Sequence, residues 1–570
     1  MAVAACWTLQ GQNLNPTIEV TNVYEGSMVE IRKPEQKMNI PDSVGRFNLA
    51  FDYSVFENPY EGAYEFSPYR ISMKPEAASA PERRFFLRAG AGYGFHPELD
   101  VVYSPLTGEK LRLDVFAGYG GYAGKYRSIK PLTREDGTVA LTRDGKESWF
   151  GYDMSANAGA SLRFGWETGE ITSALGYNRL MTKDPLLARG LDAIEASGRV
   201  RSLRNDSGYF LYDASLKYRY SHDASLAYGS FPKEKMLGGH MFSFDGSFGP
   251  VFDEGHRVIA DIDVDLSRFT GLLDGFEAMI AFAPSYRYVS ERWKWSLGLV
   301  IGAFIGNDNT PGAGHLPMNG RKGQIIYPDL RASFFIPAAN LSLYASATGG
   351  PSLENYSALT EKNHWFNPHY GSIGCLMDNS FERVNAKVGF KGNIADRFVY
   401  DLSGGYVRKG GAVTDAVLPS VRPDQAGFYP AISFTDWGMW YADFGMSWLS
   451  NYFEFTSHTS FKKANIRDSY VFAPALLSGE NLFAYSWKGR VKAGLGCDFA
   501  SARKATLDVP AGTVLKIPGW VDASLYAEYA FTHKMGFWVK AGNLLNMTIQ
   551  RTPYYAERGI YFTAGLFLTF

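Results

Sequence analysis

The fold is decided by the stretch Val258-Ile-Ala-Asp-Ile-Asp-Val-Asp-Leu266. Successive side chains of a β-strand point to opposite faces of the sheet. Here one face is apolar, and the other carries the carboxylates of Asp261, Asp263 and Asp265. Period-2 alternation of this kind indicates a strand with one apolar and one polar face. The same pattern recurs at 156–166, 212–220, 384–391, 490–499 and 521–531.

The length of these segments separates a membrane barrel from a soluble sandwich. Many run for about 11 to 15 residues, whereas strands of soluble sheets average about 5 or 6. A tilted strand needs about 9–11 residues to cross the hydrocarbon layer. Aromatic residues lie near segment ends, as at Tyr152, Trp166 and Trp440, and such rings favour the headgroup zone. We therefore predict an all-β, transmembrane antiparallel β-barrel.

Composition excludes several other classes. Among the 570 residues, aromatics make up 15% and glycine occurs 60 times, but hydrophobic content is only 46%. We find no apolar run of about 18 residues, which a membrane helix would need. The net charge of −1 gives no electrostatic case for nucleic acid. Three widely spaced cysteines without a Cys-x-x-Cys motif argue against a zinc knuckle or a disulfide framework.

Connections of alternating length set the predicted topology. Turns of a membrane barrel are short on the periplasmic side, and loops are longer outside. On this rule we expect about 22 strands in a multi-pass protein of the cell outer membrane. Short turns are predicted at 167–170, 221–223, 253–255, 290–292, 337–340, 393–396 and 532–535, and long loops at 182–206, 306–324, 350–380, 409–430 and 464–483.

The two ends of the chain carry processing signals. Residues 1–12 read as the remnant of a signal peptide, 13–60 as a short periplasmic segment and 61–570 as the barrel. The chain ends on an alternating strand with a terminal aromatic. Such an end resembles the signal that outer-membrane assembly machinery recognises, here carried by Phe562, Leu566, Leu568 and Phe570. The expected partners are therefore the lipid bilayer and that machinery.

The last hairpin resembles a known family. The stretch Val539-Lys-Ala-Gly-Asn-Leu-Leu-Asn546, the loop with Thr552-Pro-Tyr-Tyr555 and the pair Arg558-Gly559 resemble the end of TonB-dependent receptors. The resemblance covers roughly residues 60–570, its overall character looks like proteins of the Bacteroidota, and it implies a 22-stranded barrel that transports solutes. A full receptor of this family places a plug of roughly 130 residues before its barrel. No recognisable plug stands in the segment 13–60, so energised transport by the usual mechanism is not expected.

Few residues in the sequence indicate a functional site. Predicted lumen-lining residues carry both signs: Asp261, Asp263 and Asp265 against Lys387, Lys391, Arg490 and Lys492. Two interpretations of these residues are open. They line a polar path for a solute, or they pair across strands in a lumen that is polar by default. The pair His364 and His369 is weak as a metal site; an aromatic loop over the barrel mouth is the preferred interpretation. We predict no cofactor, no metal site and no enzyme activity, because no catalytic constellation stands out.

Two functions remain open. The first is transport of solutes across the outer membrane by a receptor-like barrel without its plug. The second is a non-transporting scaffold or accessory subunit of an envelope complex, with an occluded lumen and other envelope proteins or lipoproteins as partners. Because an open lumen of this width would breach the permeability barrier, its own loops or a partner would have to fill it.

Overall fold

The computed structural model describes residues 84–570, apart from 186–187, 204–208, 225–236, 253–254, 272, 307–317, 366–371, 374–376, 396, 420–427, 488 and 509–511. All of these belong to one compact unit, Ala50–Phe570. The predicted signal remnant and periplasmic segment, and the start of the barrel at residue 61, lie outside the described residues.

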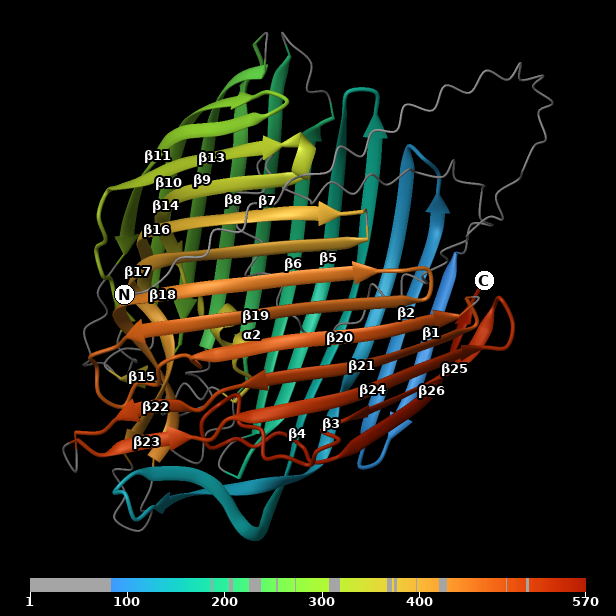
Figure 1. Cartoon of the computed structure of the whole chain (residues 1–570), viewed down its shortest axis with the longest axis vertical. Helices are drawn as coiled ribbons and strands as arrows, with labels where there is room; N and C mark the ends of the chain where they lie inside the picture. Colours follow the sequence, from blue (N-terminus) through green and yellow to red (C-terminus); the bar gives the residue numbers. More distant parts are fainter. Residues whose placement is uncertain are drawn as a thin grey trace, which may run out of the picture. The chain divides into compact units, whose positions relative to one another are not determined.

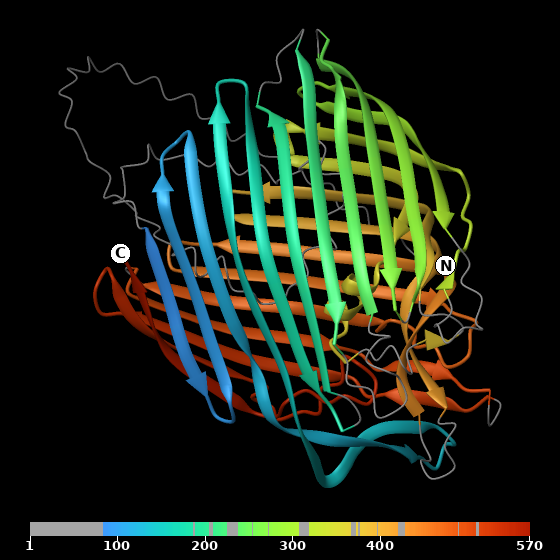
Figure 2. The same ribbon diagram turned by 180° about the vertical axis from the view of Figure 1, so that it is seen from behind.

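Within the described residues, 22 antiparallel strands form a closed wall (Figures 1 and 2), which confirms the predicted fold class and strand number. The strands of the wall are β1 (Phe85–Gly92), β2 (His96–Thr107), β3 (Leu111–Thr133), β4 (Val139–Trp166), β5 (Gly169–Lys183), β6 (Ala188–Ser202), β7 (Phe210–Asp223), β8 (Leu237–Pro250), β9 (His256–Thr270), β10 (Gly275–Val289), β11 (Trp293–Gly306), β13 (Ile326–Ile336), β14 (Leu341–Leu353), β16 (Met377–Ile394), β17 (Phe398–Pro419), β18 (Phe428–Leu449), β19 (Phe453–Asn465), β20 (Leu477–Trp487), β21 (Val491–Ala500), β24 (Trp520–Ala530), β25 (Met535–Gly542) and β26 (Tyr561–Thr569).

The first and last strands close the wall. β1 pairs with β26 from Phe86–Thr569 to Gly92–Thr563, so neither strand is left with an open edge. Closure matters because hydrocarbon offers no partner to an unpaired backbone group. At the seam, a Cβ atom on Gly90 would collide with the fully buried ring of Trp538, so this position needs glycine.

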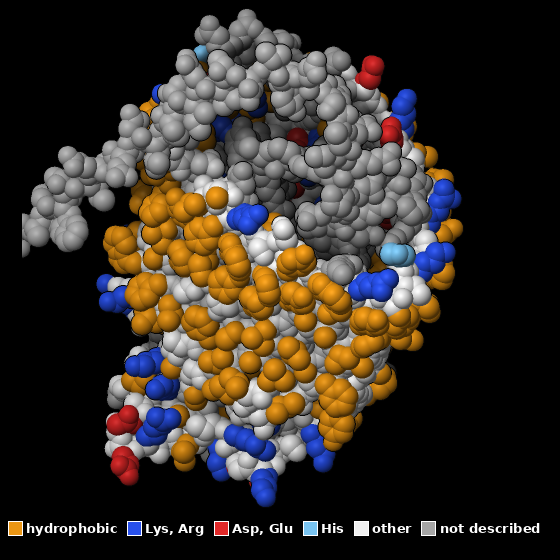
Figure 3. Space-filling view, turned by 45° about the vertical axis from the view of Figure 1, so that its right-hand side comes forward, with side chains coloured by type: hydrophobic (Ala, Val, Ile, Leu, Met, Phe, Trp, Pro, Cys, Tyr) orange, Lys and Arg blue, Asp and Glu red, His pale blue; other side chains and the backbone are white. Residues whose placement is uncertain are grey.

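The outer face of the wall is apolar. The four residues of the predicted assembly signal, three on β26 and Phe570 directly after it, share this face, and Phe562, Leu566 and Phe570 are 55–58% exposed. Because apolar surface is more stable away from water, a face with bulky apolar side chains exposed to this extent is suited to contact with lipid. Figure 3 shows a broad apolar band on one side of the barrel, with Lys and Arg side chains gathered along its margins.

The predicted connections are wrong in three regions. The expected loops at 409–430 and 464–483 contain the end of β17, the start of β18 and the start of β20. The expected loop at 182–206 contains β6, and the expected turn at 221–223 is the end of β7, paired to both neighbouring strands. The outward positions of β6 include Gly190, Asp192 and Gly198, so the strand shows too few bulky apolar residues to reveal its alternation. The predicted turns at 290–292 and 337–340 are confirmed.

The two ends of the barrel differ in length of connection. We call one the turn end: it holds short connections such as 108–110, 167–168 and 450–452. By the general rule it faces the periplasm. The other, the loop end, holds connections such as 354–376 and 543–560.

Some strands run far beyond the length needed to cross a membrane. β3 and β4 have 23 and 28 residues, and β17 and β18 have 22 each, against the roughly 9–11 that a crossing needs. The excess lies at the loop end, where the β3–β4 hairpin bends across the barrel (Figures 1 and 2).

These extensions form a second apolar core, which we call the cap. It combines the tip of β3–β4, the end of β17, residues 466–476 and the hairpin of β22 (Arg503–Thr506) and β23 (Val514–Ile517). β23 pairs in parallel with β4 at Leu515–Val139. The core consists of Leu141, Val417, Phe472, Ala505, Leu507, Leu515 and Ile517, each at most 3% exposed.

Four elements complete the described chain: β12 (Met318–Asn319), β15 (Ser372–Ile373), the 3-10 helix η4 (Pro337–Ala339) and the α-helix α2 (Tyr356–Lys362). In the described part of the chain no helix combines the length and the apolar character needed to span a membrane.

Candidate functional site at the loop end of the barrel

The predicted acidic stripe lies on the inner face of β9. Asp261 is 8% exposed, receives a 2.5 Å hydrogen bond from Arg287 of β10 and a further bond from Ser247 of β8. Asp263 and Asp265 follow on the same face, opposite Asp245 and Ser243 of β8. At Asp261 the structure therefore agrees with pairing of lumen charges across strands.

The predicted basic residues lie elsewhere on the circumference. Lys387 and Lys391 are on β16, where the ammonium of Lys387 lies 5.7 Å from the ring centre of Tyr344. Lys492 is on β21, opposite Glu528 of β24. Four strands separate β9 from β16, so acidic and basic residues do not form one site.

The assignment of Arg490 to the lumen is wrong. It lies in the connection between β20 and β21 at the turn end, where it is exposed to solvent. The alternation of β21 begins only at Val491, and Trp487, Gly489 and Arg490 form the turn before it, as the hydrogen bond from the Arg490 amide to the Trp487 carbonyl shows.

One loop crosses the lumen at the loop end. It leaves β14, forms the helix α2 and returns to β16, and we call its described part, residues 354–365, the crossing loop. The helix begins after Asn355, whose side chain accepts a 2.8 Å hydrogen bond from the amide of Ala358. Such a cap satisfies one of the free amides at the start of a helix.

A buried triad fixes α2 to the opposite part of the wall. Arg189 of β6 and Asp223 of β7 form an ion pair of 2.7 Å, and both side chains are only 2% exposed. The hydroxyl of Tyr356 donates a 2.5 Å hydrogen bond to Asp223 and accepts one of 2.8 Å from Arg189. Burial raises the pKa of Tyr356 well above its ordinary value, so the hydroxyl keeps the proton that it donates.

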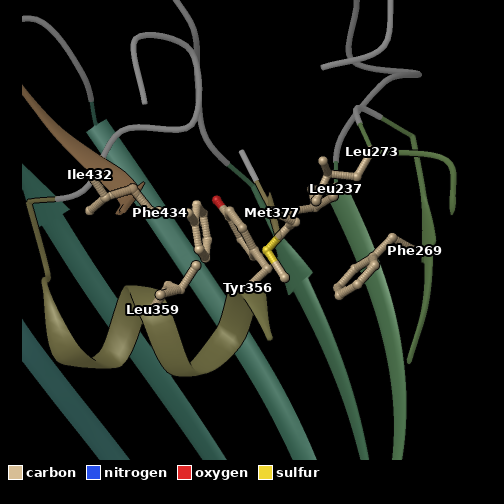
Figure 4. Close-up of a cluster of buried hydrophobic side chains, with 8 residues drawn as sticks. All are labelled: Leu237, Phe269, Leu273, Tyr356, Leu359, Met377, Ile432 and Phe434. Atoms are coloured by element: carbon tan, nitrogen blue, oxygen red, sulfur yellow. The ribbon is translucent and has the colours of Figure 1, made fainter. Parts of the chain in front are cut away.

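Apolar contacts hold the other sides of α2. Figure 4 shows the ring of Tyr356 between Phe434 and Met377, with Leu359 below them. The cluster joins α2 to strands on both sides of the barrel: Leu237 of β8, Phe269 of β9, Met377 of β16 and Ile432 and Phe434 of β18, with Leu273. α2 is therefore a bridge across the mouth.

The end of the crossing loop is attached by polar contacts. Glu361 pairs with Arg219 of β7. His364 Nδ1 lies 2.8 Å from a carboxylate oxygen of Asp153 of β4. Burial of the ring lowers the pKa of His364, but the hydrogen bond and charge of Asp153 raise it by more, so this pKa lies above its ordinary value. The ring is therefore charged over a wider pH range than in a free histidine.

Aromatic rings then join the crossing loop to the last loop of the chain. Trp365 stacks on Tyr555 with ring centres 4.9 Å apart and planes 6° apart, and it meets Trp149 edge-on at 5.7 Å. The hydroxyl of Tyr555 donates a 2.5 Å hydrogen bond to Asp184. The predicted aromatic loop at the barrel mouth is thus present as far as Trp365, while His369 lies outside the described residues.

The residues that resemble a receptor hairpin shape this last loop. Asn543 and Asn546 have φ angles of 46° and 53°, in the left-handed region that asparagine tolerates. The side-chain amide of Asn543 donates 2.9 Å and 3.0 Å hydrogen bonds to the carbonyls of Met547 and Arg558. Arg127 of β3 donates to the carbonyls of Asn546 and Met547. The asparagines therefore fold residues 543–560 back over the mouth.

Sequence reasoning missed the partners of α2. Arg189 lies in a segment predicted as loop, and Asp223 in one predicted as turn. The wall charges Arg189, Asp223, Arg219 and Asp153 all lie on inward positions, but nothing in the sequence joins them to a loop more than 130 residues away. The described residues hold no cluster of three or more His, Cys, Asp or Glu arranged to bind a metal ion.

Comparisons with known proteins give the fold. No family model matches the sequence, and no curated protein matches it by sequence. Solved structures do match. The FrpB iron transporter from Neisseria meningitidis (F3-3 variant) has a TM-score of 0.63 at 10% identity, covering 86% of this chain and 82% of that chain.

Two further solved structures match this chain to a similar degree. The copper transporter OprC has a TM-score of 0.59 at 12% identity, covering 86% and 83% of the two chains. The siderophore receptor PirA from Acinetobacter baumannii has a TM-score of 0.58 at 9% identity, covering 86% and 80%. At such identities the likeness establishes the fold alone. The chain is a multi-pass outer-membrane β-barrel with the fold seen in TonB-dependent receptors.

Proposed function

We propose that this barrel passes a solute across the outer membrane and that the crossing loop is its gate. The observation that carries the proposal is how the loop is held. α2 contributes no strand pairing to the wall and is attached by side-chain contacts: the Arg189–Asp223–Tyr356 triad, Glu361–Arg219 and His364–Asp153. Such contacts can break without opening a backbone ladder.

The wall itself is suited to stay rigid while the loop moves. Its strands are joined by continuous backbone ladders that close through β1 and β26. Elements that move in function come from parts with few backbone bonds to the rest. The inner face is polar, with charges paired across strands as in Asp261–Arg287, so a path behind the gate would be wet. Names of the matching structures, which include transporters of iron and copper, support transport as the class of function.

Conductance in planar bilayers tests the proposal. We compare the wild type with a variant whose residues 355–365 are replaced by a Gly-Ser linker, and with Asp223→Asn, which weakens the triad. Arg112→Gln is the matched control, because its ion pair with Asp114 is exposed and unconnected to the loop. We expect larger and more frequent openings in both loop variants and an unchanged control. Retention of the barrel is checked by its heat-dependent mobility in SDS gels.

A second candidate is a non-transporting scaffold with an occluded lumen, and the buried triad favours it. An ion pair that is 2% exposed on both partners is strongly held once formed, because removing one partner leaves a buried charge. If neither the wild type nor the linker variant conducts or passes solute into liposomes, transport is contradicted. Co-purification of a stoichiometric envelope protein in mild detergent would then support the scaffold.

A further inference from the structure

A groove and a pocket meet on the outside of the wall. The groove has a volume of about 690 Å³ and crosses β11, β13, β14, β16, β17 and β18. The pocket has a volume of about 750 Å³ and lies over β16–β19. Tyr406 and Trp440 line both, so the two are contiguous. We call them the outer groove and the basic pocket.

The outer groove is shaped by small residues between large ones. Its floor is formed by Ala332, Ala345 and Gly404, which strand pairing places at one level of the wall together with Val388. Its sides include Leu330, which is 45% exposed, and Trp440, which is 64% exposed. A channel of this kind, on a face that meets hydrocarbon, fits an acyl chain.

The basic pocket has the opposite chemistry. Its lining carries five cations and one carboxylate, Asp436. The cations are Arg383, Arg408, Lys409, Lys463 and Arg467. Asp436 is already engaged by Arg321 and by Arg383 at 3.7 Å, and Lys409 pairs with Glu382 at 3.5 Å. Within the described residues, Arg408, Lys463 and Arg467 form no ion pair, so three cations are left without a counter-charge.

The position of the basic pocket along the barrel axis shows which layer of the membrane it faces. Aromatic residues mark both borders of the apolar band here: Phe398 pairs with Trp448 near the turn end, and Tyr406 pairs with Trp440 toward the loop end. From Phe398 to Arg408 the strand runs for about 11 residues, the length that crosses the hydrocarbon. The three unpaired cations therefore begin at the headgroup level of the leaflet that faces the loop end.

We propose that this surface binds one phosphate-bearing lipid of the outer leaflet, with an acyl chain in the outer groove and phosphate in the basic pocket. Arginine is well suited to such a headgroup, because its planar guanidinium donates two hydrogen bonds to phosphate. The exposed ring of Trp440 sits at the junction, where a lipid changes from apolar to polar. The proposal concerns the outside of the wall and holds whether or not the lumen conducts.

Lipid retention by the purified full chain tests the proposal. The probe is diphosphorylated lipid A, offered in detergent micelles, with enzymatically dephosphorylated lipid A and dioleoyl phosphatidylcholine as comparisons, and bound lipid is counted by native mass spectrometry. We expect one tightly bound diphosphorylated molecule per wild-type chain. The triple variant Arg408→Gln, Lys463→Gln, Arg467→Gln should lose at least about tenfold in affinity, because charge-assisted bonds to phosphate are removed.

A second triple variant controls for net charge. Arg143→Gln, Lys146→Gln and Lys504→Gln remove the same charge from exposed residues at the loop end that do not line the pocket. It should bind like the wild type. Filling the groove with Ala345→Leu should weaken binding of the lipid but leave competition by inorganic phosphate unchanged. Equal retention by both triple variants, or equal retention of diphosphorylated and dephosphorylated lipid A by the wild type, would overturn the proposal.

Discussion

The wall and the cap of this barrel use the same apolar residue types in opposite ways. In the wall, Leu566 is 58% exposed and Leu525 is 47% exposed, because their environment is lipid. In the cap, Leu141 and Leu515 are fully buried against residues of other loops. The wall needs only backbone pairing and an alternating pattern. The cap needs particular side chains from distant segments to meet, so the two regions should respond differently to substitution.

The crossing loop shares features with both the wall and the cap, and a substitution in its buried triad should have the largest effect. Asp223→Ala removes the carboxylate that neutralises Arg189 in a site that is 2% exposed. We expect the free energy of opening the crossing loop to fall by about 3–5 kcal/mol. Amide hydrogen exchange over residues 356–363 measures this. The wall should stay intact, so unchanged exchange in the loop, or loss of the barrel itself, would contradict the distinction.

Substitution of matched leucines sharpens the comparison. Leu515→Ala should destabilise the cap by about 2–4 kcal/mol, because it leaves a cavity in a core that cannot collapse freely. Leu525→Ala on the outer face of β24 should cost less than about 1 kcal/mol, because lipid fills the space. Limited proteolysis near Lys504, followed by peptide mapping, reports opening of the cap. Similar cleavage in the two variants would show that the cap is not a separate core.

The wall could be predicted from the sequence because the alternation within each strand shows which residues face outward and which face inward. The alternation at 258–266 and 521–531 needs no knowledge of distant residues. The first segment lies in β9, and the second lies in β24 up to Ala530. β6 escaped because Gly190 and Gly198 supply too little apolar bulk on its outer face. An aromatic loop at the mouth was predicted, but the contacts of the cap and of the crossing loop could not be, because they join residues far apart: Arg189 meets Tyr356, and Leu141 meets Leu515.

A pair of stacked aromatic rings at the barrel mouth should show a smaller effect. Trp365 and Tyr555 stack face to face with planes 6° apart, joining two loops that have no strand pairing to each other among the described residues. A double-mutant cycle with Trp365→Ala and Tyr555→Ala should give a coupling energy of about 0.5–1.5 kcal/mol. Hydrogen exchange in the crossing loop supplies the four free energies. Purely additive effects would mean that the two loops are held independently by the wall.

The smallest effect should come from pH at His364. Its pKa in the folded state is raised above the ordinary 6.5, mainly by Asp153 against the cost of burial. A raised pKa means that the contact stabilises the closed loop fully below the ordinary pKa and loses this contribution as the pH rises through the folded-state value. Since the ring is 37% exposed, solvent screening should keep the contribution below about 1 kcal/mol. Hydrogen exchange at residues 356–363 between pH 5.5 and 8.5, corrected for intrinsic rates, should therefore show weaker protection at the alkaline end. His364→Gln should remove the pH dependence of exchange in the crossing loop and leave exchange in the cap unchanged. If the variant keeps the full pH dependence, a group other than His364 is the one that titrates.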